Sequence, residues 1–351
     1  MEVRNVLVVR FRQMGDAVLA TPLLCALQAK YPEAHIDFVL NERIAPLFEG
    51  HPAIHRIMTF TDEERHSVWQ YIKKVWQTVH HVHYDVIIDM RSTVNTMLFA
   101  LFSPSTPCRI GIRKPYTWLA FNHRFEGCED DESMIDHNLK LLSPLGIDGG
   151  NRRLMLKVTN EEQESFRNYM QQQGIDFARP VALVGVTAKL ADKTWAEDRM
   201  TETLRRFMAA FPTVQLIFNF APGREAENAR RIDDALGRPA NVFINIEAKG
   251  PRQLAAMAAN CTFYFGNEGG ARHIVQAMGR PSLIVCSPMA SKRTWLPEND
   301  EVLTRGIAAA DLADVGGMSY KEQYDLITVE RVWPVLQSFY RQIEEKDRSE
   351  R

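Results

Sequence analysis

Short runs of apolar, often β-branched residues alternate with longer stretches of helical periodicity along most of the chain. In the first half this pattern predicts strands at residues 3–9, 35–40, 54–60 and 85–89, with helices at 17–31 and 64–79. Parallel strands need a crossover connection between them, and a helix is the usual one. The first half therefore reads as a parallel α/β sheet.

A second region of the same kind begins at residues 180–186, a continuous apolar run typical of a strand that is buried on both faces. A helix that starts near Thr159 and ends at Gly174 leads into this run. Beyond it the pattern predicts helices at 196–211, 223–236, 251–259 and 270–278, and strands at 214–218, 242–244, 262–265 and 281–285. This alternation predicts a second doubly wound sheet, followed by an amphipathic helix at 329–345.

The predicted elements divide the 351 residues into two Rossmann-like domains, 1–165 and 166–328, and a helical tail, 329–351. We expect the tail to pack back toward the first domain. Doubly wound sheets bind ligands beyond the carboxyl ends of their strands. The two domains are therefore expected to face a central cleft, with the reactive side chains in loops that follow strands.

The overall charge and composition exclude several classes of protein. Forty-two basic and 44 acidic side chains leave a net charge of -2, which gives no indication of nucleic-acid binding. No apolar run approaches the roughly 18–20 residues that span a bilayer, and the N-terminus has no signal-like segment, so we expect a cytoplasmic protein. The five cysteines are widely spaced and form no Cys-x-x-Cys pair, which predicts buried free thiols.

The loop after the first strand carries Gly15 and Asp16. A nicotinamide-dependent dehydrogenase would have three glycines in this loop, so a single glycine disfavours that class. Taken alone, Asp16 reads as a cap of the following helix, because acids are favoured in the first turn.

The loop at residues 186–195 follows the best strand of the second half. It supplies the Thr187 hydroxyl and the ammonium groups of Lys189 and Lys193, which suit phosphate oxygens. The alternative is a solvated surface turn.

Two further loops of the second half suit the same kind of ligand. Gly269 and Gly270 either expose helix-terminal amides to an anion or allow a tight turn. Glu225 begins another helix, where it either accepts ribose hydroxyls or caps the helix. Together these loops suit a nucleotide diphosphate.

The combination of motifs resembles the ADP-heptose:lipopolysaccharide heptosyltransferases, glycosyltransferase family 9. The N-terminal signature is matched by Val6-Leu7-Val8-Val9-Arg10 and by Met14-Gly15-Asp16-Ala17-Val18-Leu19-Ala20-Thr21-Pro22-Leu23. The C-terminal signatures are matched by Asp192-Lys193-Thr194-Trp195 and Gly266-Asn267-Glu268-Gly269-Gly270-Ala271-Arg272-His273. The resemblance spans nearly the whole chain in the same order, except for residues 91–160.

The resemblance implies a GT-B fold and an inverting transferase that uses no metal and no cofactor. It implies that Asp16 is the catalytic base and that Lys193 stabilises the departing ADP, helped by Thr187 and the amides of Gly269 and Gly270. The other donor-binding residues that it implies are Gly15, Lys189, Glu225, Lys249, Gly250, Glu268 and His273.

Residues 109–118 mix basic and aromatic side chains, among them Arg109, Arg113, Lys114 and Tyr116. In a heptosyltransferase such a segment would suit a phosphorylated glycolipid acceptor or the headgroup layer of a membrane. The alternative is a surface loop without a binding role.

Two residues depart from the family pattern. Glu268 stands where the family usually has an aspartate that contacts the donor sugar, and Arg272 stands where small or polar residues are common. We expect an ADP-heptose donor and a lipopolysaccharide-core or other glycolipid acceptor, reached from the cytoplasm at the inner membrane leaflet. The alternatives are another nucleotide sugar, or a catalytically silent homologue that binds nucleotide or glycan.

Overall fold

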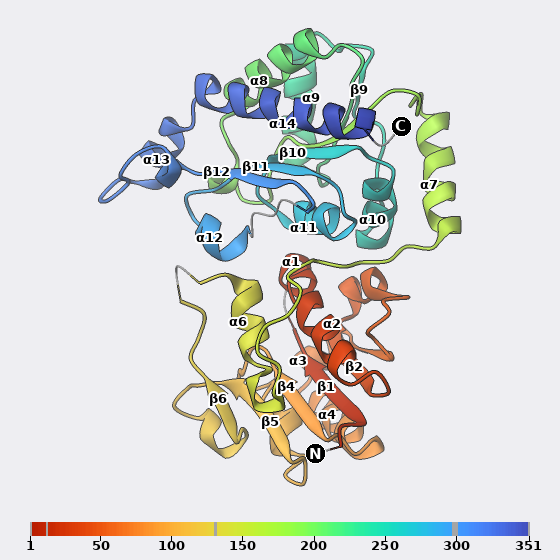
Figure 1. The fold of residues 1–351 in the computed structure, drawn as a ribbon, viewed down its shortest axis with the longest axis vertical. Helices are drawn as coiled ribbons and strands as arrows, with labels where there is room; N and C mark the ends of the chain where they lie inside the picture. The colour runs from red at the N-terminus through yellow and green to blue at the C-terminus, as the bar shows by residue number, and fades with distance from the viewer. Residues whose placement is uncertain (1, 12, 130–131, 297–300, 350–351) are drawn as a thin grey trace. The chain divides into compact units, whose positions relative to one another are not determined.

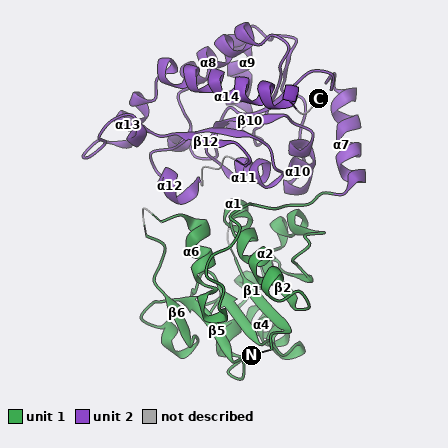
Figure 2. Cartoon of the chain, viewed as in Figure 1, with its two compact units in different colours: residues 1–158 green, residues 159–351 purple. Residues whose placement is uncertain are grey.

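The computed structural model describes residues 2–11, 13–129, 132–296 and 301–349. Figure 2 shows its two compact units, residues 1–158 (unit 1) and 159–351 (unit 2). The division falls before the predicted boundary at residue 165, because the whole of helix α7 (Asn160–Gln172) packs on α10 (Pro251–Ala259) of unit 2.

Unit 1 is built on a six-stranded parallel sheet in the order β3-β2-β1-β4-β5-β6. Each neighbouring pair of strands is parallel. The chain builds the sheet outward from β1 to β3, and then crosses back so that β4 pairs with the other side of β1. The strands are β1 (Asn5–Val9), β2 (His35–Asn41), β3 (Arg56–Phe60), β4 (Val86–Asp89), β5 (Cys108–Ile112) and β6 (His123–Phe125).

The helices of unit 1 are shorter than the periodicity predicts. The expected helix at 64–79 is two helices, because Ser67 has an extended backbone and its hydroxyl accepts a hydrogen bond from the amide of Gln70. The expected helix at 17–31 is likewise divided. The helices are α1 (Met14–Val18), α2 (Thr21–Lys30), α3 (Asp62–His66), α4 (Val68–His81), α5 (Leu98–Leu101) and α6 (Met134–Lys140), with 3-10 turns η1 (Glu42–Phe48), η2 (Thr117–Leu119) and η3 (Ser143–Leu145).

Unit 2 repeats the same strand order in a second parallel sheet, β12-β11-β10-β7-β8-β9. The strands are β7 (Val181–Gly185), β8 (Gln215–Phe218), β9 (Val242–Phe243), β10 (Phe263–Asn267), β11 (Ser282–Val285) and β12 (Thr304–Ile307). Besides α7 and α10, its helices are α8 (Glu197–Ala210), α9 (Arg224–Leu236), α11 (Gly270–Ala277), α12 (Lys292–Trp295), α13 (Tyr320–Leu326) and α14 (Val329–Ser349), with 3-10 turns η4 (Ala191–Lys193) and η5 (Ala309–Asp311).

Helix α14 belongs to unit 2 rather than forming a separate tail. Its buried residues Leu336, Phe339 and Tyr340 lie in one apolar cluster with Phe207 of α8 and Phe263 of β10. The blue α14 and green α8 run beside each other in Figure 1. That the helix also approaches the N-terminal domain stays a prediction.

Three strands carry too few apolar residues to be predicted from the pattern. β5 contains Arg109, β6 reads His-Arg-Phe, and β12 contains Arg305 and Gly306. Each lies in the outer part of its sheet, where neighbours rather than its own sequence hold it in place. Residues 109–112, expected in a surface segment, therefore form a strand. The cysteines match their prediction more closely: none of the five forms a disulfide with a described residue, and Cys108, Cys261 and Cys286 are buried.

Two glycines bring β7 and β10 close together at the centre of unit 2. Gly185 and Gly266 are paired in register, and Gly266 has a φ of 145°. A Cβ on Gly266 would lie 2.4 Å from the carbonyl oxygen of Gly185 and 2.6 Å from its nitrogen. Since these contacts involve backbone, no side-chain movement relieves them.

We predict that Gly266→Ala destabilises unit 2 by at least about 3 kcal/mol, as overpacking against a rigid backbone does, lowering its thermal midpoint by about 6–12 °C. Circular dichroism of the full chain during heating measures this midpoint. Gly127→Ala is the control, because an added Cβ there meets nothing within 4 Å. Equal midpoints for the two variants would show that the close approach is not required.

Candidate active site

Asp16 lies in α1, immediately beyond the carboxyl end of β1. It is 8% exposed, and its Oδ1 lies 3.2 Å from Nη2 of Arg10. Arg10 follows β1 directly and donates from Nη1 to the carbonyl oxygen of Met90, just after β4. The carboxylate is thus anchored where β1 and β4 diverge, the point at which doubly wound sheets bind ligands.

The loop after β4 completes this region of unit 1 and was not expected from the sequence. Asp89 is fully buried and accepts hydrogen bonds from the amides of Arg91 and Ser92, at 2.9 and 2.8 Å. Burial raises the pKa of Asp89, and these hydrogen bonds oppose the rise. Ser92 has a positive φ of 50°, so the turn is held in a conformation that few residues adopt. The sequence did contain one signal for this loop, because Asp89 is an acidic residue at the end of a predicted buried strand.

The predicted acceptor-binding residues divide into two groups. Lys114 and Tyr116 lie over the loop after β4, donating to the carbonyl oxygens of Arg91 and Ser92 at 3.0 and 3.4 Å. Arg109 instead holds structure together, because its guanidinium donates to the carbonyl oxygens of Ala120, Pro104 and Thr106. Arg113 forms an exposed ion pair with Glu126.

The loop after β7 is fixed to the rest of unit 2 from two sides. Asn267, at the end of β10, accepts from the amide of Trp195 at 2.6 Å and donates to the carbonyl oxygen of Gly185 at 3.0 Å. Arg224 of α9 donates to the carbonyl oxygens of Ala188 and Lys189. A loop held in this way keeps its shape before a ligand arrives.

Three polar groups of this loop remain available for a ligand. Thr187 is buried, and its hydroxyl has no hydrogen-bond partner among the described residues. Lys189 is exposed and Lys193 half-buried, and neither ammonium group has an ion pair with a described residue. A buried, unsatisfied hydroxyl beside two ammonium groups suits an anionic ligand rather than a turn that only solvent contacts.

The loop after β10 presents backbone to the same edge of the sheet. Gly269 precedes α11 with φ and ψ both 178°, an extended conformation open to any residue. A Cβ added there would meet nothing within 4 Å. The glycine is therefore not needed for a tight turn, and the open space favours close approach of a ligand to the amides of Gly269 and Gly270.

Buried Arg272 lies next to the partly buried Glu268 at this loop. Arg272 has no exposed surface, and its Nη2 lies 3.9 Å from Oε1 of Glu268 and 2.9 Å from the carbonyl oxygen of Trp295. Glu268 also accepts from the amide of Ser287 at 3.2 Å. The Arg272 side chain, which is atypical for the family at this position, is therefore directed into the interior of unit 2.

His273 lies beside Arg272 and is also buried. Burial, and then the charge of Arg272, lower the pKa of His273 well below its ordinary value. Its imidazole is thus neutral at physiological pH. It can still donate one hydrogen bond to a phosphate oxygen.

The remaining predicted donor residues follow β8 and β9 at the same carboxyl edge. Glu225 stands in the first turn of α9. One of its carboxylate oxygens accepts a hydrogen bond from the amide of Ala221 at 3.3 Å, which stabilises the loop between β8 and α9. Gly250 precedes α10, and the amide of Lys249 donates to the side chain of Gln253. All the predicted donor residues of unit 2 therefore follow four adjacent strands of one sheet.

A cavity of about 620 Å³ in unit 2 lies at the opposite edge of this sheet. Its lining includes Val181 and Thr262, at the amino ends of β7 and β10, and Lys346 of α14. The cavity is thus separate from the donor residues, and we do not assign the donor to it.

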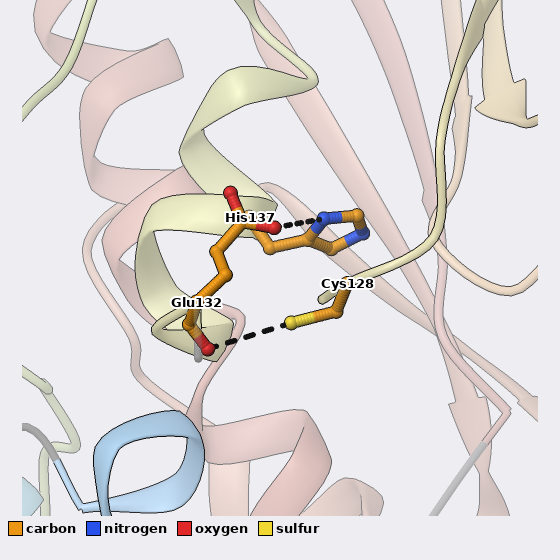
Figure 3. A group of neighbouring side chains, drawn as sticks. All are labelled: Cys128, Glu132 and His137. Carbon is orange, nitrogen blue, oxygen red and sulfur yellow. Dashed lines mark hydrogen bonds and ion pairs between the residues drawn. The ribbon is translucent and has the colours of Figure 1, made fainter. Parts of the chain in front are cut away.

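One group in the described part of the chain has the donor atoms of a metal site (Figure 3). The ligand atoms of Cys128, Glu132 and His137 lie within 4.8 Å of one another. Glu132 is already paired, with Lys140 and, at 3.2 Å, with Nδ1 of His137. Burial would raise the pKa of Glu132, but Lys140 and His137 together lower it. These contacts form an ion-pair cluster that joins Glu132, in the loop before α6, to two residues of that helix.

Comparisons with known proteins agree on one family. The model of glycosyltransferase family 9 (heptosyltransferase) matches residues 72–309. The chain is 22% identical to lipopolysaccharide heptosyltransferase 3 of Escherichia coli K12 over 303 residues, which cover 81% of this chain and 83% of that protein.

Two solved structures share the fold of the whole chain. A family 9 glycosyltransferase from Veillonella parvula superposes with a TM-score of 0.81 at 17% identity, covering 97% of this chain and 98% of that one. The Escherichia coli ADP-heptose lps heptosyltransferase II superposes with a TM-score of 0.77 at 21% sequence identity. The match covers 97% of this chain and 99% of that one. The predicted GT-B class of two doubly wound units is confirmed.

Among the described residues, no helix has both the length and the apolar character that a bilayer span requires. The strand order of both sheets, the loops that follow their strands and the match to the family model lead to the same assignment. The chain belongs to glycosyltransferase family 9, the heptosyltransferase family.

Proposed function

We propose that this glycosyltransferase moves heptose from ADP-heptose to a lipopolysaccharide-core or related glycolipid acceptor, with inversion and without a metal. Two of the named relatives are lipopolysaccharide heptosyltransferases, and one of these two is described as an ADP-heptose enzyme. The observation that carries the proposal is the position of Asp16. Its carboxylate lies at the switch point of the unit 1 sheet and is oriented there by a buried arginine.

In the proposed reaction Asp16 takes the proton of an acceptor hydroxyl while that oxygen forms a bond to the anomeric carbon of the donor. The bond between this carbon and the phosphate oxygen breaks, and ADP leaves with the electron pair. Attack from the side opposite to ADP inverts the anomeric configuration. A sugar hydroxyl is a poor nucleophile at neutral pH, so removing its proton is the help that the step requires.

The departing ADP gains negative charge, which the loops of unit 2 are suited to stabilise. In the proposal Lys193 supplies an ammonium group, Thr187 its buried hydroxyl, and Gly269 and Gly270 their amides. His273 donates as a neutral imidazole. The loop after β7 is anchored by Asn267 and Arg224, so its backbone needs little reorganisation as charge develops.

We further propose that the acceptor is held in the inner leaflet of the cytoplasmic membrane and that the enzyme works at that surface. Lys114 and Tyr116, which lie over the loop after β4, are the candidates for acceptor contacts in unit 1.

We predict that Asp16→Asn lowers kcat by about 10²–10⁴-fold, because the base is lost while the side-chain shape is kept. Binding of ADP, measured by calorimetry, should stay at the wild-type level. Asp148→Asn is the matched control, an exposed acid of the same unit. A folded Asp16→Asn enzyme that transfers sugar at the wild-type rate would rule out this role.

Lys193→Ala should weaken ADP binding about tenfold to a hundredfold, since a hydrogen bond to a charged group contributes about 1.5–3 kcal/mol. Titration calorimetry measures the dissociation constant directly. Lys321→Ala, an exposed lysine of α13, is the control and should bind ADP normally. If the two variants bind ADP equally well, Lys193 has no part in the phosphate site.

A thermal-shift screen over nucleotides and nucleotide sugars tests the donor. ADP-heptose at a hundred times its dissociation constant should stabilise the protein by about 2.7 kcal/mol, with UDP- and GDP-sugars silent. Stabilisation by a UDP- or GDP-sugar alone would assign another donor. Stabilisation by ADP-heptose with no transfer to any lipopolysaccharide acceptor would favour a catalytically silent homologue.

A further inference from the structure

We propose that unit 1 docks on an anionic bilayer through the outer surface of α4, α5 and η2. The proposal rests on the proposed function only in requiring a lipid-anchored acceptor, and its test needs no sugar transfer. Three observations support it: where the exposed apolar side chains gather, which side of the sheet they cover, and how charge is distributed around them.

Exposed large apolar side chains are concentrated in one part of the chain. Of the twelve found among the described residues, eight lie between residues 68 and 119. Trp69 is 83% exposed, Trp76 52%, and Trp118 61%. The other members are Val68, Val94, Leu101, Tyr116 and Leu119. Scattered single exposures are normal in proteins, whereas a gathering of this size marks an interaction surface.

The elements that carry these side chains cover the same face of the unit 1 sheet. Tyr71 and Val75 of α4, Phe99 of α5 and Phe121 after η2 all pack into one buried cluster, together with Ile87 of β4. The rings of Trp76 and Phe102 also meet, with centroids 5.7 Å apart, and join α4 to the end of α5. The side chains of α4, α5 and η2 that point away from this cluster therefore lie on the outer side of one layer over the sheet.

Helix α4 shows the character of this surface most clearly. Trp69, Lys73, Trp76 and His80 recur at helical spacing and are all exposed, opposite the buried Tyr71 and Val75. His80 stacks on Trp76, with ring centroids 3.8 Å apart. A stripe in which the Lys73 ammonium group lies between two tryptophans suits the headgroup layer, where indole rings and ammonium groups are both stabilised.

The charge of the surface selects an anionic partner. Residues 68–81 and 90–125 contain no aspartate or glutamate, although the average of the chain would give about six in 50 residues. Seven basic residues fall in these segments, namely Lys73, Lys74, Arg91, Arg109, Arg113, Lys114 and Arg124. Two of these cations are neutralised by flanking acids, Lys74 by Glu64 and Arg113 by Glu126, and the other five have no ion pair with a described residue.

A symmetric dimer through this surface is disfavoured, because it would bring basic side chains against one another. Anionic lipid attracts them instead, each cation near the surface adding about fivefold to the affinity. The same acid-free segment contains Lys114 and Tyr116, which contact the loop after β4. A bilayer on this surface therefore lies next to the segment proposed to receive the acceptor.

The test is flotation of the full-length protein with vesicles of phosphatidylethanolamine and phosphatidylglycerol, and with vesicles of phosphatidylcholine alone. We expect binding to the anionic vesicles, weakened by salt. Trp69→Gln with Trp76→Gln should reduce it at least about tenfold, and Lys73→Gln about fivefold. The controls are Tyr320→Gln and Lys321→Gln, exposed residues of α13 in unit 2, which should bind as the wild type does.

Wild-type flotation that the tryptophan variants do not reduce would overturn the proposal, as would absence of flotation. Sedimentation velocity without lipid supplies a second readout: a dimer that the same variants dissociate would assign the surface to self-association. Transfer to a detergent-dispersed acceptor separates the two proposals. Transfer without vesicle binding removes the docking surface alone, and vesicle binding without transfer removes the proposed function alone.

Discussion

The arrangement of both units depends on one constraint, the reversal of chain direction beside the first strand of each sheet. In unit 1 the loops after β1 and β4 separate at this point, and in unit 2 the loops after β7 and β10 do so. Because parallel strands end at the same edge, side chains far apart in sequence are brought there together. Asp16 and Asp89 in one unit, and Lys193 and Glu268 in the other, owe their positions to this reversal.

Each reversal point also contains a buried arginine next to an acid. Arg10 pairs with Asp16, and Arg272 lies 3.9 Å from Glu268. Burying two charges seldom adds net stability, but removing either partner costs several kcal/mol because the other remains unpaired in a dry site. Such pairs hold a carboxylate in one orientation. The structure thereby links the two departures from the family pattern: Glu268 and Arg272 contact each other and form one feature.

The sequence revealed the parts of this architecture that depend on local pattern. Residues 180–186 read as a buried strand because every position there is apolar or small, and β7 lies within them. The edge strand β6 has no such apolar run. The division of the predicted helix at Ser67 depends on a side-chain cap, which the spacing of apolar residues does not reveal. Burial of Arg10 and Arg272 depends on neighbours distant in sequence. The contacts of Arg109 were likewise not evident from local pattern, since its guanidinium joins the turn at Pro104 and Thr106 to Ala120.

The near-neutral total charge conceals a marked division along the chain. The 44 acidic residues avoid two segments of unit 1, 68–81 and 90–125, whereas the helices of unit 2 pair acids with arginines, as Glu202 does with Arg205 and Arg206. Intrahelical pairs of this kind leave little net field. In those segments only Lys74 and Arg113 are paired with described acids, so the potential of the other basic residues extends to about a Debye length, roughly 8 Å at physiological salt. Exposed tryptophans within that field make a surface whose apolar and electrostatic preferences point to the same anionic partner.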